Sequence, residues 1–285
     1  MELYYKIVGL FEVLLGLVIS LVSFIKEPCK VLPKYSPKNY NKLLVLGNGP
    51  SLLDQLDFIS NNRDGSELIC LNGFSRSDKY EFLKPELYFL IDPVFFKDDW
   101  EIYDIATSTL LNIRQKTNWN LLLIIPRKWK KSKSVKQLSD NKNISIGYIN
   151  HVPMVGSLNF IKKTLFKLEL CTPVFQNVLI AAIFFGINRK YKEINLFGTD
   201  HSWLNDLIVD KNNTAYLKDH HFYETKTIKL VNIDKSPKKA YVFINQIQTM
   251  LREYSVLNSY ARVMGVKIIN FTIDSHIESF DKKSI

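Results

Sequence analysis

Cysteine is scarce in this sequence, and its scarcity argues against two classes of protein. The 285-residue chain has three cysteines, Cys29, Cys70 and Cys171, which lie far apart and form no Cys-x-x-Cys pair. Structural zinc sites and disulfide frameworks both need closely spaced or paired thiols. Neither is therefore expected, and the cysteine content is typical of a reducing compartment.

The chain also lacks the motif that binds a metal ion to a nucleotide diphosphate. No Asp-x-Asp occurs, and neither Asp98–Asp99 nor the pair Asp54 and Asp57 supplies it. We therefore expect no metal ion and no other cofactor. A nucleoside monophosphate is then favoured as leaving group, because N–H and hydroxyl groups can stabilise it without a metal.

The net charge of +10 indicates an anionic partner, or simply a solvated basic surface. A nucleotide, a nucleic acid and a membrane surface all remain candidates at this level. The positive charges are scattered, however, and no motif combines basic and aromatic residues in the pattern of a nucleic-acid binder. Nucleic acid is therefore not the expected partner.

One long apolar run lies near the N-terminus. Residues 8–25 carry a single charge, Glu12, and reach the lower limit for a helix that crosses a membrane. Tyr4 and Tyr5 precede the run, and four lysines follow it, which predicts that the rest of the chain stays on the cytoplasmic side of the membrane. A helix for oligomer contact and an ordinary core helix are the alternatives.

The chain is therefore predicted to have three parts. Residues 1–28 form a hydrophobic membrane-associated helix, residues 29–42 a linker with prolines and lysines, and residues 43–285 the main domain. Whether residues 8–25 span the membrane or lie on it is left open.

Apolar runs alternate with helix-length segments throughout the main domain. Five strands are expected at 43–47, 67–74, 86–93, 120–126 and 192–200, and a sixth after Gly265. Residues 172–186 are typical of a helix, with Thr172 as N-cap and Gly186 at its end. This pattern predicts an α/β fold with a Rossmann-like, mostly parallel sheet and helices on both faces.

Polar residues follow several of these strands, at the edge where parallel sheets bind ligands. The first such cluster is Gly47, Asn48, Gly49 and Ser51. It has neither the third glycine of a dinucleotide fingerprint nor the lysine of a P-loop. Glycine lets a backbone approach a ligand closely, and the following helix offers free N–H groups to an anion. The turn is thus interpreted as a nucleotide-binding loop, with a plain strand-to-helix turn as the alternative.

Other candidates lie at later strand ends and in the histidine-rich segment. Asn72 follows the second strand and either holds a base or sugar or simply makes a turn. A single histidine is preferred over a zinc cluster as the reactive group, because imidazole transfers protons near neutral pH. The candidates for the chemistry are His221, His220, Asp200 and His201, and those for nucleotide binding also include Gly198, Tyr223 and Ser275. For the segment around Ser275, a helix capped by Asp274 is the alternative.

Taken together, these motifs resemble the small bacterial sialyltransferases that have a single Rossmann-like domain. The resemblance rests on a strand followed by GNGPSL, a strand followed by Asn72, the tripeptide at 198–200 and a histidine followed by an aromatic residue. It implies a fold like a variant of glycosyltransferase A and inverting, metal-independent transfer from a CMP-activated sugar. The pterin-diphosphokinase-like Rossmann proteins share the glycine turn.

The same resemblance implies roles for individual residues. Gly47, Asn48, Gly49 and Ser51 would hold CMP, with Asn72 near the donor phosphate or sugar. His221, or else His220, would be the general base, and Tyr223 or Tyr216 would contact the phosphate. The family has an arginine and a Thr-Ser-Gly where this chain has TPVFQN, so another nonulosonate or a Kdo-like sugar stays open as donor.

Three hypotheses follow for the function. The first is a membrane-associated glycosyltransferase that acts on a glycan or lipid-linked glycan acceptor for a surface polysaccharide, such as a capsule, O-antigen or lipopolysaccharide. The second is an ATP- and Mg²⁺-dependent diphosphokinase-like enzyme that relies on carboxylates such as Asp92 and Asp200. The third is a non-catalytic, membrane-bound assembly partner.

Overall fold

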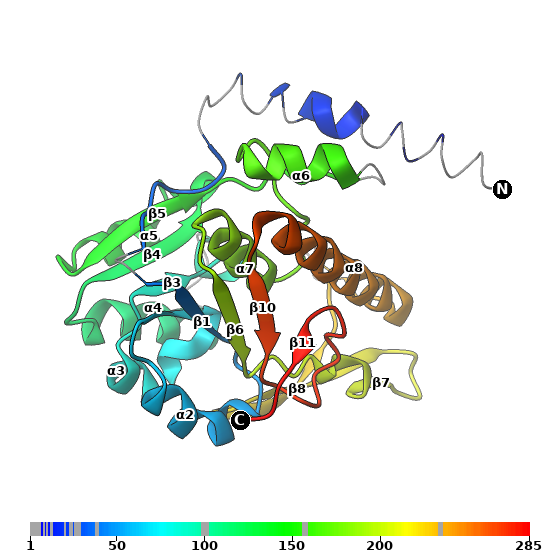
Figure 1. Ribbon diagram of the computed structural model, residues 1–285. Helices are drawn as coiled ribbons and strands as arrows, with labels where there is room; N and C mark the ends of the chain where they lie inside the picture. Colours follow the sequence, from blue (N-terminus) through cyan, green and yellow to red (C-terminus); the bar gives the residue numbers. More distant parts are fainter. Residues whose placement is uncertain are drawn as a thin grey trace.

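The computed structural model shows an α/β fold built on one large parallel sheet (Figure 1). The structure describes residues 7, 9, 11, 14–19, 21–22, 25, 30–37, 40–97, 103–155, 159–232 and 236–285. Cys29, Asp98–Asp99 and part of the predicted membrane segment 8–25 lie outside these residues. Among the described residues, no helix is both long enough and apolar enough to cross a membrane.

The large sheet has eight strands in the order β11-β10-β6-β1-β2-β3-β4-β5, and every neighbouring pair is parallel. The strands are β1 (Lys42–Leu46), β2 (Ser66–Leu71), β3 (Leu87–Phe89), β4 (Leu121–Pro126), β5 (Ile144–Ile149), β6 (Glu193–Phe197), β10 (Lys267–Asn270) and β11 (Asp281–Lys282). The six strands expected from the apolar runs are all present, and the expectation of a mostly parallel sheet is confirmed.

Successive residues of β1 point into two different hydrophobic cores, which shows that both faces of the sheet are covered. Leu43 and Val45 pack with α6, α7 and α8, whereas Leu44 and Leu46 pack with α2, α3, α4 and α5. The helices are α2 (Leu52–Asn61), α3 (Lys79–Leu83), α4 (Asp104–Lys116), α5 (Lys133–Ser139), α6 (Asn159–Lys167), α7 (Val178–Asn188) and α8 (Ala240–Met264). Near-continuous apolar strands fold this way because each side chain needs a covered face.

A second, antiparallel sheet was not expected from the sequence. It contains β7 (Leu207–Val209), β8 (Ala215–His221) and β9 (Glu224–Lys229) and lies between β6 and α8 in the chain. The amide of Phe222, in the turn between β8 and β9, donates to the carbonyl of Asn48. This bond fixes the β8–β9 hairpin beside the turn that follows β1.

The helix predicted at 172–186 begins and ends elsewhere. It runs from Val178 to Asn188, and the side chain of Asn177 accepts from the amide of Ile180 at its N-terminus. Thr172 is extended, because its amide and carbonyl bond to the segment that follows β5. Gly186 lies inside the helix, where an added Cβ would meet Leu43 and Ile194 at 2.7 and 2.8 Å. Close packing on the sheet, not helix termination, therefore explains the glycine.

Described residues before β1 also contact the main domain. Val31 and Leu32 are buried, and Val31 bonds through its backbone to Asn150 and Glu169. The hydroxyl of Tyr35 donates to the buried carboxyl of Glu67. The division into residues 1–28, 29–42 and 43–285 stays a prediction, but residues 31–35 pack on the domain that follows them.

Candidate functional site

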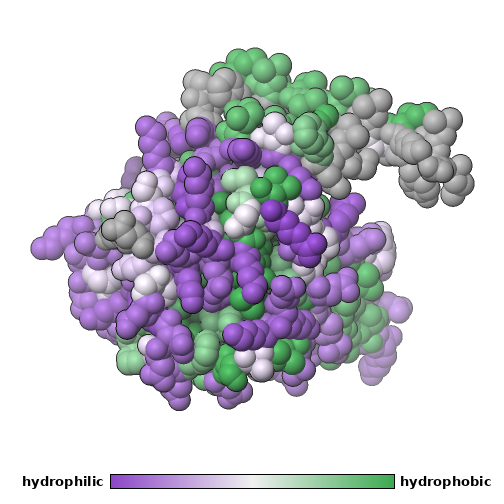
Figure 2. Space-filling view, in the orientation of Figure 1, coloured by the Kyte–Doolittle hydropathy of each residue, from purple (hydrophilic) through white to green (hydrophobic). Residues whose placement is uncertain are grey.

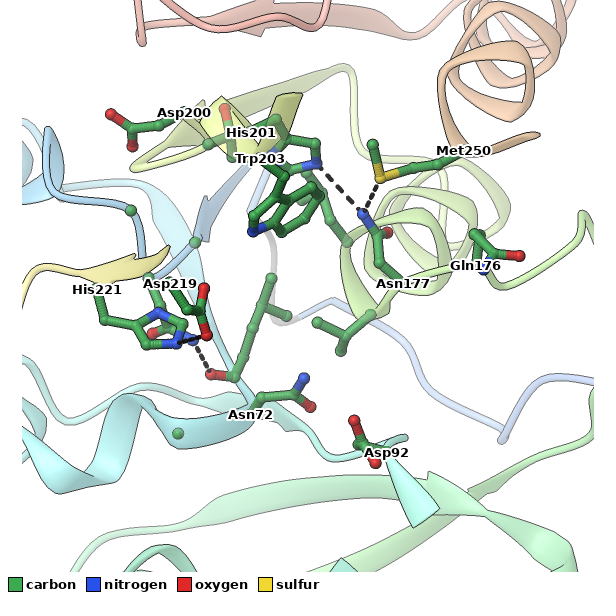
Figure 3. A pocket seen from close by; sticks show the side chains of 18 of the residues that line it. Asn72, Asp92, Gln176, Asn177, Asp200, His201, Trp203, Asp219, His221 and Met250 are labelled. Atoms are coloured by element: carbon green, nitrogen blue, oxygen red, sulfur yellow. Dashed lines mark hydrogen bonds and ion pairs between the residues drawn. The ribbon is translucent and has the colours of Figure 1, made fainter. Parts of the chain in front are cut away.

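A cavity of about 520 Å³ opens at the point where the strand order changes direction. The chain runs from β1 outward to β5 and then returns to β6 on the other side of β1, and parallel sheets bind ligands at such a switch point. The turn after β1, the tips of β2, β3 and β6, the N-terminus of α7, the first half of α8 and the β8–β9 hairpin all line the cavity. Figure 3 shows side chains from several of these elements around it.

The glycines of the β1 turn make room for the tip of β6. A Cβ on Gly47 would lie 2.2 Å from the carbonyl oxygen of Gly198, and one on Gly49 would lie 1.8 Å from the carboxylate of Asp200. That carboxylate accepts from the hydroxyl of Ser51 at 2.8 Å and from its amide at 3.3 Å. Asp200 therefore occupies the start of α2, where the sequence predicted room for a ligand anion. Burial raises the pKa of Asp200.

Two carboxamide oxygens on the cavity wall are buried and lack a hydrogen-bond partner. They belong to Asn48, after β1, and Asn72, after β2. Asn48 is fixed because its amide nitrogen donates to the carbonyl of Leu71 at 3.0 Å. Asn72 has a left-handed backbone with φ of 43°, which non-glycine residues adopt rarely. Buried acceptors without partners cost free energy, so these two oxygens indicate a bound group that donates hydrogen bonds.

A histidine–carboxylate pair lies on the β8–β9 hairpin. The Nε2 atom of His221 is 3.1 Å from the carboxylate of Asp219, and both residues line the cavity. Nε2 is thus the protonated nitrogen when the imidazole is neutral, which leaves the lone pair of Nδ1 for an incoming proton. The imidazole stacks on the ring of Tyr223 with centroids 5.2 Å apart. The pair therefore has the orientation that a general base needs.

Tyr223 brings a hydroxyl to the same part of the cavity. Its oxygen is buried without a hydrogen-bond partner and lies 2.5 Å from the position that a Cβ on Gly73 would take. Burial raises the pKa of Tyr223, so the hydroxyl stays protonated and can donate. Arg76 lies over the ring and pairs with Glu224, which fixes the hairpin to the segment after β2.

His201 is held in a very different way. Its Nε2 atom is 2.7 Å from the hydroxyl of Tyr254 and 3.2 Å from the amide nitrogen of Asn177. The amide nitrogen of Asn177 can only donate, and it donates to the hydroxyl of Tyr254 and to Nε2 of His201. Nε2 is therefore an acceptor, and the ring is neutral. Burial, with a smaller effect of His276, lowers the pKa of His201 to about 3. The ring is therefore a poor general base at neutral pH.

Figure 3 shows His201 and Asn177 on one wall of the cavity, and His221 with Asp219 on another. His220, the neighbour of His221, pairs instead with Asp206 at 3.5 Å and with Thr225 at 3.1 Å. The two adjacent histidines thus have separate carboxylate partners, which makes one a natural control for the other.

The structure brings most of the sequence-predicted residues to one place. The cavity is lined by Gly47, Asn48, Gly49, Asn72, Gly198, Asp200, His201, His220, His221 and Tyr223. Ser51, Tyr216 and Ser275 are not among the lining residues. Ser51 bonds to Asp200, and buried Ser275 donates to the carbonyl of Thr199 at 2.5 Å. No helix begins at Asp274.

Two residues of the site were missed. Asp219 shares a strand face with His221 two residues later, a signal that needs β8 to be recognised as a strand. Asn177 stands directly before an unbroken apolar run, which is a usual position for an N-cap. Within the described residues, no group of three or more His, Cys, Asp or Glu side chains could hold a metal ion.

Comparison with known proteins supports the fold. No family model matches the chain, and no curated protein matches its sequence. Among solved structures, it is similar to the MAf glycosyltransferase from Magnetospirillum magneticum AMB-1, with a TM-score of 0.52 and 14% identity. The match covers 90% of this chain but 35% of that protein, so this chain corresponds to about a third of its length. At this identity the likeness shows a shared α/β fold and nothing more specific.

Proposed function

We propose that this protein is a glycosyltransferase that moves a sugar from a nucleotide-activated donor to a glycan acceptor. The observation that carries the proposal is the His221–Asp219 pair, which lies in the same cavity as the partnerless oxygens of Asn48 and Asn72. Such a cavity offers a base on one side and acceptors for sugar or nucleotide groups on another. The glycosyltransferase name of the structural neighbour, whose fold is shared, adds support.

In the proposed reaction, Nδ1 of His221 takes the proton from an acceptor hydroxyl, while Asp219 stabilises the imidazolium that forms. The acceptor oxygen then bonds to the anomeric carbon as the bond from that carbon to the donor phosphate oxygen breaks. The electron pair of the broken bond leaves with the nucleoside monophosphate. A single displacement of this kind inverts the configuration at the sugar.

The leaving phosphate needs stabilisation in a cavity with little positive charge. Among the described residues that line it, there is no lysine or arginine. The hydroxyl of Tyr223 is the best-placed donor, and backbone amides can add to it. Hydrogen bonds from neutral groups suit a monophosphate leaving group, so we propose a CMP-linked donor, with sialic acid or a related sugar, and no metal ion.

The proposal also covers where the protein acts. We propose that residues 8–25 associate with a membrane, on the cytoplasmic face of a bacterial inner membrane, and that the acceptor is a surface glycan or its lipid-linked precursor. The apolar N-terminal run and the lysines that follow it support this location.

Replacement of the proposed base tests the reaction directly. We expect His221→Ala to lower turnover of a CMP-sialic acid donor by roughly 10²–10⁴-fold, with little change in CMP binding by thermal shift. His220→Ala is the matched control and should stay within about twofold, because His220 pairs with Asp206. Near-wild-type activity of His221→Ala would contradict the assignment.

A ligand panel separates the other hypotheses. Thermal shifts with CMP, CDP, UDP, GDP and ATP, each with Mg²⁺ or with EDTA, should show CMP stabilisation that survives EDTA. Stabilisation by ATP only with Mg²⁺ would favour the diphosphokinase-like enzyme. The absence of any nucleotide effect would favour a non-catalytic assembly partner.

A further inference from the structure

Exposed apolar side chains are concentrated in the N-terminal segment. Every described large hydrophobic residue there except Leu17 is at least 44% exposed, namely Ile7, Phe11, Leu14, Leu15, Val18, Ile19, Leu21, Val22 and Ile25. Soluble monomers rarely leave so many neighbouring apolar side chains in water. We therefore expect this side of the segment to be covered by another apolar surface.

The other side of the same segment rests on the main domain. Gly9 and Gly16 are buried, seven residues apart, and thus lie on one side of a helix. A Cβ on Gly16 would lie 2.5 Å from the sulfur of Met154, and Leu17 packs against the core under α6, α7 and α8. The glycines let the segment approach the domain closely, which holds it along the domain surface.

Helix α6 continues the exposed apolar surface. Phe160 at its start is 83% exposed, Leu168 just after its end is 52% exposed, and Lys167 at its last position is exposed as well. Figure 2 shows apolar residues gathered over the N-terminal segment and α6, in contrast to the mostly polar surface below. Exposed Lys30 and Lys34 follow the segment. An apolar strip with cations beside it is complementary to an anionic lipid surface.

We propose that residues 7–25 lie in the plane of the membrane interface together with α6, instead of crossing the bilayer. A spanning helix would have to leave its contacts with Met154 and the core, and the domain would then no longer cover the side that carries the two glycines. An in-plane helix keeps those contacts and places its exposed side in the lipid. This inference rests on the membrane association proposed above and specifies its geometry.

The first test asks whether α6 belongs to the membrane-binding surface. Binding of the full chain to vesicles of phosphatidylcholine and phosphatidylglycerol, at a ratio of about three to one, is measured by co-sedimentation. We expect Phe160→Glu to weaken binding by about tenfold or more. Phe82→Glu is the matched control, because Phe82 is 69% exposed on α3, on the opposite face of the sheet, and should change binding by less than twofold. Equal effects of the two variants would overturn the role of α6.

The second test distinguishes an in-plane helix from a spanning one. In a chain with Cys29→Ser, single cysteines are introduced by Glu2→Cys and by Asp57→Cys, Asp57 being an exposed residue of α2 on the opposite face of the sheet from α6; the remaining Cys70 and Cys171 are buried. After the protein is inserted into sealed inner-membrane vesicles, a membrane-impermeant thiol reagent should label both positions from the same side. Labelling of position 2 only after the vesicles are opened would show a spanning helix and overturn the inference.

The outcomes also separate this inference from the proposed function. If wild-type protein does not bind vesicles, both the membrane association and the in-plane geometry are overturned, whereas the activity assays with His221→Ala still judge the glycosyltransferase. If the lipid-free chain instead forms a dimer that Phe160→Glu disrupts, the surface is an oligomer contact and the lipid proposal is wrong. A monomer without lipid supports it.

Discussion

His201 and His221 line the same cavity but are held by opposite kinds of contact. His201 accepts from Asn177, contacts Tyr254 on α8, and its surroundings keep it neutral. His221 has one carboxylate partner and a free ring nitrogen on an antiparallel hairpin. The comparison shows that residue type and location in a cavity do not assign a role. What a histidine can do depends on which nitrogen is left available and on whether its neighbours favour charge.

The largest expected effect comes from the carboxylate beside His221. We expect Asp219→Asn to lower turnover by roughly 10²–10⁴-fold, because the imidazolium loses its stabilising charge and the ring its fixed tautomer. Steady-state kinetics with the CMP-sugar donor measure the loss. Asp206→Asn, which affects the pair with His220 instead, should stay within about twofold. Equal losses in the two variants would show that the hairpin is merely being loosened.

The next effect concerns stability on the His201 side. Asn177→Ala should lower the free energy of unfolding by about 2–3 kcal/mol, since it removes an N-cap, leaves the hydroxyl of Tyr254 without its donor and takes one of two donors from His201. Urea unfolding measures the change. Ser132→Ala, which removes the cap of α5, should cost only about 1 kcal/mol. If the two variants lose the same amount, the contacts to His201 and Tyr254 add nothing.

The smallest effect is on how the free energy of unfolding depends on pH. His201 takes up a proton near pH 6.5 in the unfolded chain but only near 3 in the folded one, so acid favours unfolding between these values. The stability that the neutral ring supports is complete above about pH 6.5 and is lost as the pH falls toward 3.

His151, with its pKa lowered to about 4 by burial and by Lys128, acts in the same direction. His201→Gln should therefore reduce, but not abolish, the stability lost between pH 7 and pH 5. The reduction should be about 1–2 kcal/mol, measured by urea unfolding at the two pH values. An unchanged difference would mean that His201 is protonated normally in the folded protein.

The sequence predicted the large sheet well because its central strands are buried on both faces and are therefore apolar along their length. Strand β5 lacks this pattern, since Ser145 is exposed and Gly147 interrupts the run. The strands β8 and β9 are mostly polar or charged, so their pairing could not be recognised from apolar runs. These strands gain their stability from tertiary contacts that a local pattern does not contain.

The same reasoning explains which part of the site could be predicted. The glycine turn and the polar strand ends follow from the rule that parallel strands bring their carboxyl ends together. The pairing of Asp219 with His221 could have been predicted only if β8 had been recognised as a strand. The occupation of the α2 N-terminus by Asp200 depends on a contact across 149 positions of sequence, which no local motif reveals.

The contact between Ser51 and Asp200 also determines when the site can form during synthesis of the chain. The turn after β1 is among the first parts of the main domain to be synthesised, yet its shape depends on Asp200 and on the backbone of Gly198. A nascent chain that ends before β6 contains the glycine turn but lacks Gly198 and Asp200, against which that turn packs. The cavity therefore cannot form before β6 and Asp200 have been synthesised, and the glycine turn cannot be transferred to another protein as a short autonomous loop.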